Sequence, residues 1–136
     1  MEIKQRYTLK KEDKLKSRKT IEQLFKEGKS FSNFPLRVLW KFNETSAASL
    51  QTGFAVSSKH FKKAVDRNRI KRLMREAYRL QKTDLHNQLK QQQKSIAVFF
   101  IYVGKELPEY NFIFEKTNHV LVRLIKLTDA KTQANT

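Results

Sequence analysis

Residues 96–103 are apolar at every position, and this run constrains the fold more than any other part of the chain. A strand with one solvent-facing side alternates apolar and polar residues, whereas a strand without that alternation is covered on both faces. The run has the length of a buried strand and is far shorter than a membrane-spanning helix. We therefore expect a central strand that other elements cover from both sides.

A short helix is predicted near the N-terminus. Ile21, Leu24 and Phe25 recur there at helical spacing. Ser17 is expected to cap the first turn, and Gly28 is expected to end the helix in a left-handed conformation.

Two strands are predicted next. Residues 34–42 alternate, which indicates a strand with two unlike faces. Residues 52–58 form the second strand, and we expect it to pair antiparallel with the first across the polar connection at residues 43–51. The two faces of the first strand are Leu36, Val38, Trp40 and Phe42 on one side, and Arg37, Leu39 and Lys41 on the other.

Two longer helices complete the pattern. Residues 65–80 predict a helix before the central strand, and residues 112–127 predict a helix after it. The glutamine-rich residues 81–95 are either a fraying extension of the first of these helices or a loop. The order α-β-β-α-β-α favours the α+β class, as a single-domain sandwich with helices packed on a small mixed β-sheet.

The chain length fits one domain. A chain of 136 residues has room for one core, so we expect a single domain over residues 1–136. The basic leading segment, residues 1–16, and the tail, residues 128–136, are expected to be flexible. The leading segment lacks the apolar core of a secretory signal, which favours a cytoplasmic location.

The helix predicted over residues 65–80 is strongly basic. It carries five arginines and one lysine but only two acids. On a helical projection Ile70, Leu73, Met74 and Ala77 form one apolar stripe, and most of the cations lie on the opposite arc. The helix is thus expected to be anchored by its apolar stripe, with the basic arc displayed.

Local signals indicate where this helix starts. Asp66 is expected to be the N-cap, because its carboxylate favours the positive end of the helix dipole. Val65 precedes it, and Ile70 follows four positions later. These two side chains are expected to form a hydrophobic staple.

Positive charge dominates the whole chain. Lys and Arg number 29 and Asp and Glu number 13, so the formal net charge is +16. Glu76 can pair with Arg72 or with Arg79, but one glutamate cannot neutralise six cations. The basic arc is either a solvated charged face or a phosphate-binding face, and unneutralised Lys and Arg arrays favour the latter. The planar guanidinium group suits both phosphate contacts and stacking on unpaired bases.

The sequence contains no residue set for autonomous catalysis. The absence of cysteine excludes disulfides, cysteine-held zinc and a thiol nucleophile. His60, His86 and His119 are scattered singly, with no P-loop, Ser-His-Asp pattern or metal-ligand spacing. A protein nuclease would need carboxylates to hold its metal ions. We therefore predict no catalytic residue, no metal site and no cofactor bound by side chains alone.

The basic helix carries a recognisable motif. It reads Arg-Asn-Arg-Ile-Lys-Arg over residues 67–72 and continues with Arg75 and Glu76. The strand before it contains Gly-Phe-Ala-Val-Ser at residues 53–57. Together these segments resemble the bacterial ribonuclease P protein subunit, and the resemblance extends over residues 15–127.

This resemblance implies a ribonucleoprotein enzyme with a fold like that of ribosomal protein S5 domain 2. In that family the assembly removes the 5′ leader of precursor tRNA by hydrolysing one phosphodiester bond. The large RNA performs the catalysis with bound Mg²⁺, while the protein binds that RNA and holds the leader in a cleft. The implied partners are ribonuclease P RNA and precursor tRNA, with no membrane and no small-molecule substrate.

The resemblance also assigns RNA-binding positions. Core packing is the alternative for the two helix residues and for Leu39, and a bond to the nearby backbone is the alternative for Asn68. Spacing predicts that the cleft residues converge on one groove, whose mixed apolar and cationic character suits single-stranded RNA. The cleft positions are Ile21, Phe25, Arg37, Leu39, Lys71 and Arg75, and the positions toward the catalytic RNA are Arg67, Asn68, Arg69 and Arg72.

Three other classes of protein are weaker alternatives. A ribosomal protein shares the size and charge but would have long basic extensions. A helix-turn-helix DNA-binding domain needs a helix where residues 52–58 predict a strand. A membrane-surface protein needs large apolar residues exposed beside its cations, whereas this helix is expected to bury its own.

Overall fold

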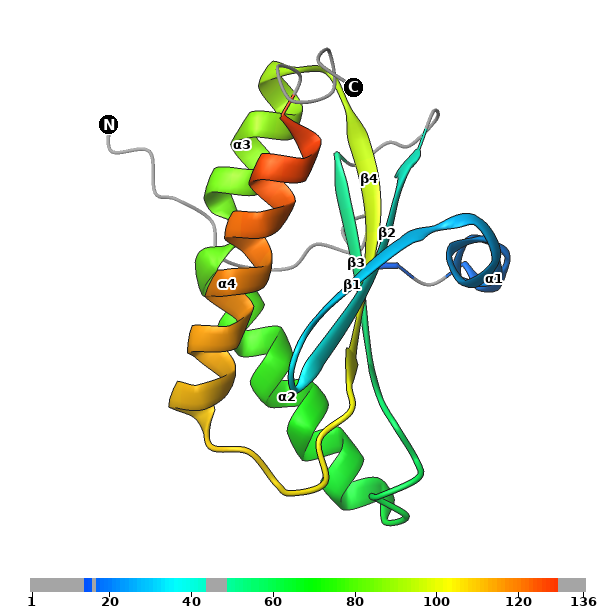
Figure 1. The fold of residues 1–136 in the computed structure, drawn as a ribbon, viewed down its shortest axis with the longest axis vertical. Helices are drawn as coiled ribbons and strands as arrows, with labels where there is room; N and C mark the ends of the chain where they lie inside the picture. The colour runs from blue at the N-terminus through cyan, green and yellow to red at the C-terminus, as the bar shows by residue number, and fades with distance from the viewer. Residues whose placement is uncertain (1–13, 16, 44–48, 130–136) are drawn as a thin grey trace.

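A computed structural model describes residues 14–15, 17–43 and 49–129 of the chain. Within these residues helices pack on both faces of one four-stranded sheet (Figure 1). The elements are α1 (Arg18–Glu27), β1 (Lys29–Asn33), β2 (Leu36–Asn43), β3 (Leu50–Val56), α2 (Ala64–Gln81), α3 (Thr83–Gln91), β4 (Ser95–Tyr102) and α4 (Tyr110–Thr128).

The sheet has the strand order β1-β2-β4-β3. β4 is antiparallel to β2 and parallel to β3, which confirms both the mixed sheet and the central strand predicted from residues 96–103. The predicted antiparallel pairing of residues 34–42 with residues 52–58 is wrong, because β4 lies between those strands. The most apolar strand takes the position with neighbours on both edges and cover on both faces.

Two elements are additions to the predicted order. β1 pairs antiparallel with β2, but Phe31 is its one buried residue, so its sequence lacks a clear apolar pattern. α3 occupies most of residues 81–95, where a fraying extension or a loop was expected. Leu85 and Leu89, one helical turn apart, are completely buried and anchor α3 to the core. The observed order is therefore α-β-β-β-α-α-β-α.

The helices cover the two faces of the sheet unequally (Figure 1). α1 lies on one face, whereas α2, α3 and α4 form a layer on the other. The predicted alternation of β2 is confirmed by this division. Leu36, Val38 and Trp40 pack into the larger core beneath α2, α3 and α4, whereas Leu39 packs beneath α1. No helix in the described ranges is long and apolar enough to cross a bilayer.

Different interactions determine where α1 begins and where it ends. The side chain of Ser17 accepts a 3.3 Å hydrogen bond from the backbone of Thr20, which confirms the predicted cap. Gly28 follows the last residue, but its φ of −68° and ψ of 154° are extended, so the predicted left-handed conformation is wrong. Glycine is needed there for space, because a Cβ atom would overlap the carbonyl oxygen of Leu24.

Packing fixes some residues that were expected in flexible ends. Leu15 is buried, and its N–H group donates a 3.0 Å hydrogen bond to the carbonyl of Thr52. Thr128 is fully buried at the end of α4, and its hydroxyl donates to the carbonyl of Leu124 at 2.7 Å. At these two positions the chain is packed against the core, and the flexibility of the two end segments stays a prediction. The rest of both segments, apart from Lys14 and Asp129, lies outside the described residues.

Gly28→Ala is expected to lower the free energy of unfolding by about 1–3 kcal/mol, because the added methyl group must displace the last turn of α1. Chemical denaturation measures this change. The control is Ser30→Ala at an exposed position of β1, which should shift the same quantity by less than about 0.5 kcal/mol. Equal stability of the Gly28→Ala protein and the parent would contradict the steric role of this glycine.

Candidate RNA interface

The apolar stripe predicted from the sequence holds α2 on the sheet. Ile70, Met74 and Ala77 are completely buried. Tyr78 extends the stripe, and its hydroxyl accepts a 2.6 Å hydrogen bond from the hydroxyl of Thr52 in β3. Because this side of α2 is fixed by packing, the opposite arc with most of its cations faces outward.

The start of α2 differs from the prediction. The helix begins at Ala64, with Lys63 as the N-cap, so Asp66 lies in the first turn and is not the cap. The side chain of Val65 is 75% exposed, and the predicted staple with Ile70 is therefore wrong. The carboxylate of Asp66 nevertheless remains close to the positive end of the helix dipole, where a negative charge is favourable.

Arg67 fixes the loop at residues 57–63 that leads into α2. Its Nη1 atom donates to the carbonyl oxygens of Phe61 and Lys62 at 2.7 and 2.8 Å. The ring of Phe61 is itself buried, with its centroid 6.0 Å from that of Tyr102. The structure therefore gives Arg67, which was predicted to face RNA, a role in shaping the loop as well.

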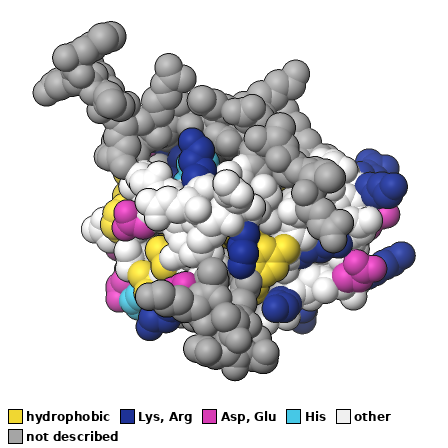
Figure 2. Space-filling view, turned by 90° about the horizontal axis from the view of Figure 1, so that it is seen from above, with side chains coloured by type: hydrophobic (Ala, Val, Ile, Leu, Met, Phe, Trp, Pro, Cys, Tyr) yellow, Lys and Arg dark blue, Asp and Glu magenta, His cyan; other side chains and the backbone are white. Residues whose placement is uncertain are grey.

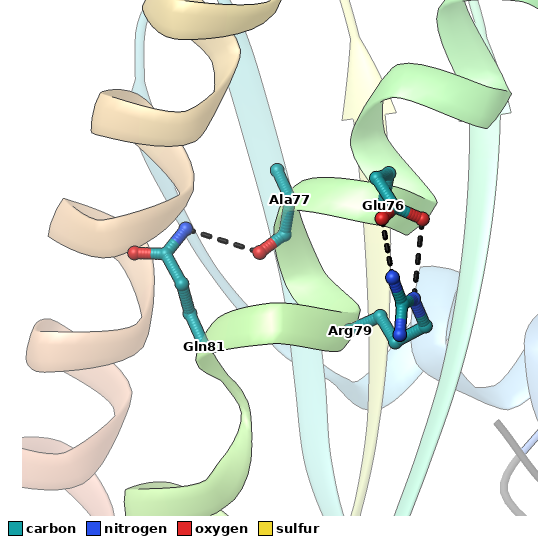
Figure 3. A network of polar contacts seen from close by, with 4 residues as sticks. All are labelled: Glu76, Ala77, Arg79 and Gln81. Carbon is teal, nitrogen blue, oxygen red and sulfur yellow. Dashed lines mark hydrogen bonds and ion pairs between the residues drawn. The ribbon is translucent and has the colours of Figure 1, made fainter. Parts of the chain in front are cut away.

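Glu76 pairs with Arg79, one of the two partners that the sequence left open (Figure 3). The Arg79 guanidinium donates through Nε to Oε2 of Glu76 at 3.1 Å and through Nη2 to the other carboxylate oxygen. The hydrogen bonds from Arg79 hold the pKa of Glu76 below its ordinary value. In the same view the Nε2 atom of Gln81 donates to the carbonyl of Ala77 at 3.0 Å. The same atom also donates to the carbonyl of Phe114 in α4 at 3.0 Å.

The other outward cations of α2 have no acidic partner among the residues that the structure describes. No carboxylate oxygen in the described part of the chain lies within 4.0 Å of Arg69, Lys71, Arg72 or Arg75. The three arginines are exposed and Lys71 is partly buried. Figure 2 looks at the molecule from above, from the end away from the start of α2, and shows other Lys and Arg side chains there. The helix therefore presents a cationic surface whose charge is not cancelled locally.

The cations of α2 divide between two flanks. Lys71 and Arg75 lie on the same side of the helix as Tyr78, at spacings of seven and three residues, and Tyr78 contacts β3. They therefore border the sheet edge that β3 forms. Arg69 lies about half a turn away from Tyr78, and Arg72 lies about a third of a turn away. Lys71 and Arg75 therefore lie on another flank of α2 than Arg69 and Arg72, and the RNA that each flank meets stays a prediction.

The face of the sheet beneath α1 carries an apolar surface. Phe25 is 57% exposed, and its ring packs edge-on against that of Phe99 with centroids 6.0 Å apart. Ile21 is partly buried against the same small core. Leu39 is only 4% exposed, which agrees with the core-packing alternative. Arg37 is exposed on this side of β2, so an apolar surface and a cation adjoin there.

Phe99 and Gly53 are parts of this surface that the sequence analysis did not single out. They are register partners in β4 and β3, and a Cβ atom at Gly53 would lie only 2.8 Å from the ring of Phe99. Glycine thus lets the ring lie down over β3, beside Phe25. The uniform apolar run at residues 96–103 hid this position, because its composition cannot distinguish the fully covered face from the partly open one.

The structure brings the predicted cleft residues together only in part. Ile21, Phe25, Arg37 and Leu39 lie together on the α1 side of the sheet. Lys71 and Arg75 belong to α2, which packs on the opposite face (Figure 1). The two groups are separated by the edge strand β3, so a single groove that joins all six residues stays a prediction. Asn68 is exposed in the first turns of α2.

The described residues contain no group of three or more His, Cys, Asp and Glu side chains placed to hold a metal ion. His60 and His119 are exposed, and His86 is partly buried. The geometry at α2 and beneath α1 is therefore that of a binding surface made of cations and apolar rings. Such surfaces contact phosphates and unpaired bases.

Comparisons of sequence give one consistent family. A family model described as Ribonuclease P matches residues 9–125. A ribonuclease P protein component from Porphyromonas gingivalis is 38% identical over 119 residues, which cover 87% of each chain. One from Chlorobium phaeobacteroides is 32% identical, with 89% of this chain and 92% of the relative covered.

Solved structures share the fold. The RNase P protein from Thermotoga maritima superposes with a TM-score of 0.60 at 27% identity, covering 81% of this chain and 96% of its own. The Staphylococcus aureus RNase P protein gives a TM-score of 0.67 over 82% of this chain and 94% of its own, and at 23% identity it shows the fold alone. The predicted α+β class is confirmed by these structures.

Arg79→Gln is expected to raise the pKa of Glu76 toward its ordinary range, because the hydrogen bonds that favour the carboxylate are lost. An NMR titration of the Glu76 carboxyl carbon measures this change. The pair stabilises the fold above the unfolded-state pKa of Glu76, and this contribution is lost as the pH falls through the lower folded-state value. Arg72→Gln is the matched control and should leave the pKa unchanged. If the pKa of Glu76 rose only in the Arg72→Gln protein, the assignment of Arg79 as its partner would be wrong.

Proposed function

This chain belongs to the ribonuclease P protein family, and on that premise we propose that it binds two RNAs at once. One is the RNA subunit of ribonuclease P, and the other is the 5′ leader of precursor tRNA. The protein positions the leader while the leader is removed to give the mature 5′ end of the tRNA. We also propose that this processing takes place in the cytoplasm.

The observation that carries this proposal is the uncancelled charge of α2. Arg69, Lys71, Arg72 and Arg75 lie outward without an acidic partner among the described residues, while the other side of the helix is packed on the sheet. Holding like charges this close is unfavourable in the free protein. Phosphate groups relieve that repulsion and release counterions when they bind. A polyanion is therefore the partner that suits this surface best.

We assign the two flanks of α2 to different RNAs. Arg69 and Arg72 would face the RNA subunit, together with Asn68 and the free nitrogens of Arg67. Lys71 and Arg75 border β3, beyond which lie Phe99 and the residues beneath α1. An RNA strand that crosses β3 from the α2 side would contact cations first and apolar rings next. That order suits single-stranded RNA, whose phosphates bind cations and whose bases stack on rings.

The leader surface beneath α1 consists of Ile21, Phe25 and Arg37, with Phe99 as an addition. Phe25 is exposed and the partly buried Phe99 packs edge-on against it, so the two rings together offer a surface for stacking. Leu39 supports this surface from below, since it is almost fully buried.

The chemistry belongs to the RNA subunit in this proposal. Phosphodiester hydrolysis would depend on Mg²⁺ held mainly by RNA, as the family resemblance implies. The contribution of this chain is electrostatic and positional: its cations reduce the repulsion between two polyanions and thereby lower the concentration of Mg²⁺ that the assembly needs.

Reconstitution tests the function directly. Added to a ribonuclease P RNA from a related bacterium at low Mg²⁺, the protein is expected to restore cleavage of precursor tRNA that the RNA alone performs poorly. Gel analysis of the released leader and of the mature 5′ end measures this activity. The same RNA at high Mg²⁺ without protein is the control for RNA folding. No stimulation by the folded protein would overturn the proposed function.

Arg75→Ala tests the division of the flanks. It is expected to weaken the binding of precursor tRNA with a long leader roughly tenfold and to leave mature tRNA binding nearly unchanged, since a lost phosphate contact typically costs this much at low salt. Equilibrium binding to the assembled enzyme measures both substrates. Arg72→Ala is the matched control: it should weaken association with the RNA subunit and affect both substrates alike. Equal losses on both substrates for Arg75→Ala would place this residue on the other surface.

A further inference from the structure

A second row of cations runs along α4. Lys116, His119, Arg123 and Lys126 follow Phe112 at spacings of four, three, four and three residues, so all five lie on one side of the helix. The row, from Phe112 to Lys126, extends for about 21 Å at the helical rise per residue. Such regular spacing on one side of a helix presents a linear array, and the following contacts show what lies beside it.

The row faces β1 and not α2. The Arg123 guanidinium lies over the ring of Phe31 in β1, 4.4 Å from its centroid. The α2 side of α4 is marked instead by Phe114, whose carbonyl accepts the hydrogen bond from Gln81. The cation–π contact restrains Arg123 over the edge strand of the sheet. This surface is therefore separate from the basic arc of α2.

A hollow lies at the end of the row that begins with Phe112. It has a volume of about 600 Å³ and lies between the β1–β2 turn, the loop after β4 and the first turns of α4. Three of its lining residues are large apolar side chains with high exposure: Phe34 at 68%, Leu107 at 46% and Phe112 at 41%. Lys116 joins the hollow to the row, because its Nζ atom lies 5.5 Å from the centroid of the Phe112 ring.

Charge distinguishes the hollow from the row. Lys116, Arg123 and Lys126 have no carboxylate oxygen within 4.0 Å in the part of the chain that the structure describes. The hollow instead has two acids, Glu106 and Glu109, and one cation, Lys105, among its lining residues. Cations thus follow the helix, and an apolar space at one end is bordered by two carboxylates and one ammonium group. An RNA strand has the matching pattern, since its phosphates are anionic and its bases carry N–H donors on flat apolar faces.

We propose that the surface between α4 and β1 is a further binding site for single-stranded RNA. An unpaired base enters the hollow and stacks on Phe34 or Phe112, and its N–H groups donate to Glu106 or Glu109. The backbone on one side of that base follows Lys116, Arg123 and Lys126. The inference rests on the proposed function, because it adds a third RNA contact to the two assigned above. The strand comes either from the RNA subunit or from precursor tRNA, which share this chemistry.

Single-stranded RNA suits this surface better than a duplex. A paired base cannot enter a side pocket, whereas an unpaired base can stack on exposed aromatic rings while cations hold its backbone. A protein partner would leave the row of cations without compensation unless it carried a matching acidic segment. Binding of such a segment is therefore the competing outcome of the experiments below.

Cross-linking locates any RNA at this surface. The chain has no cysteine, so a single introduced cysteine is a unique attachment point. His119→Cys, labelled with an aryl azide, is expected to cross-link to RNA in the assembled ribonuclease P holoenzyme. Asn87→Cys in α3 is also exposed and is the matched control, which should give little cross-linking. Sequencing the linked RNA distinguishes the RNA subunit from precursor tRNA. Cross-linking at position 119 no stronger than at position 87 would overturn the proposal.

Charge removal measures the contribution of the row. The double variant Lys116→Gln/Arg123→Gln is expected to bind a labelled single-stranded RNA of twelve nucleotides about tenfold more weakly at 0.1 M salt. The slope of log K against log salt should fall by about 1.4, since each single-strand contact contributes about 0.7. Lys90→Gln in α3 is the control and removes a cation outside the row. A thermal melt verifies that each variant is folded.

The outcomes separate this proposal from the proposed function. Stimulation of cleavage by the parent protein, together with an unchanged salt slope in the double variant, would overturn the α4 site and leave the function intact. A different outcome would assign the surface to an acidic protein segment. In that outcome the parent protein does not bind the RNA but binds a poly-glutamate peptide saturably, and the double variant does not bind the peptide. A reduced slope in the double variant and an unchanged slope in Lys90→Gln support the site.

Discussion

The burial of β4 on both faces and at both edges is the constraint on which the rest of the structure depends. Its Val98 and Phe100 side chains need cover from one layer, and Ala97 and Phe99 need cover from another. α2, α3 and α4 supply the first layer, and the shorter α1 supplies the second incompletely. Both proposed RNA surfaces near β3 follow from this unequal cover of the sheet. α1 leaves the rings beneath it partly exposed, while α2 packs on the sheet with one side and exposes its cations on the other.

The sequence predicted structure well where the spacing of apolar residues followed the burial of side chains directly. The alternation in β2 divides its side chains between the two cores as expected. In the predicted stripe of α2, Ile70, Met74 and Ala77 are buried as expected, whereas Leu73 is only partly buried. The pairing of strands could not be predicted in the same way, because it depends on which segments meet across the fold. The polar connection between β2 and β3 predicted a hairpin. The central position between these strands is instead occupied by β4, which is distant from them in sequence and more apolar than either.

Local end signals were less reliable than periodic ones for a physical reason. A cap residue contributes about 1 kcal/mol, and the contacts of the flanking loop can outweigh it. At α2 the buried ring of Phe61 and the two hydrogen bonds from Arg67 fix the loop so that the helix starts before Asp66. At α1 the glycine was expected for its backbone freedom, but the approach of Leu24 shows that its small size is what matters. The proposed RNA-binding residues could be predicted only by residue type and by side of the helix, because their exposure depends on this packing.

The distribution of charge explains how so basic a chain remains folded. The rows on α2 and α4 point to different sides of the helical layer, although the two helices pack against each other. Helix axes in contact are about 8–10 Å apart, and side chains that diverge from them are separated by more than a Debye length at physiological salt, about 8 Å. Repulsion between the rows is therefore largely screened, whereas repulsion within each row is not. If the two rows bind RNA as proposed, each would be relieved by its own polyanion, and the two surfaces would not compete for the same phosphates.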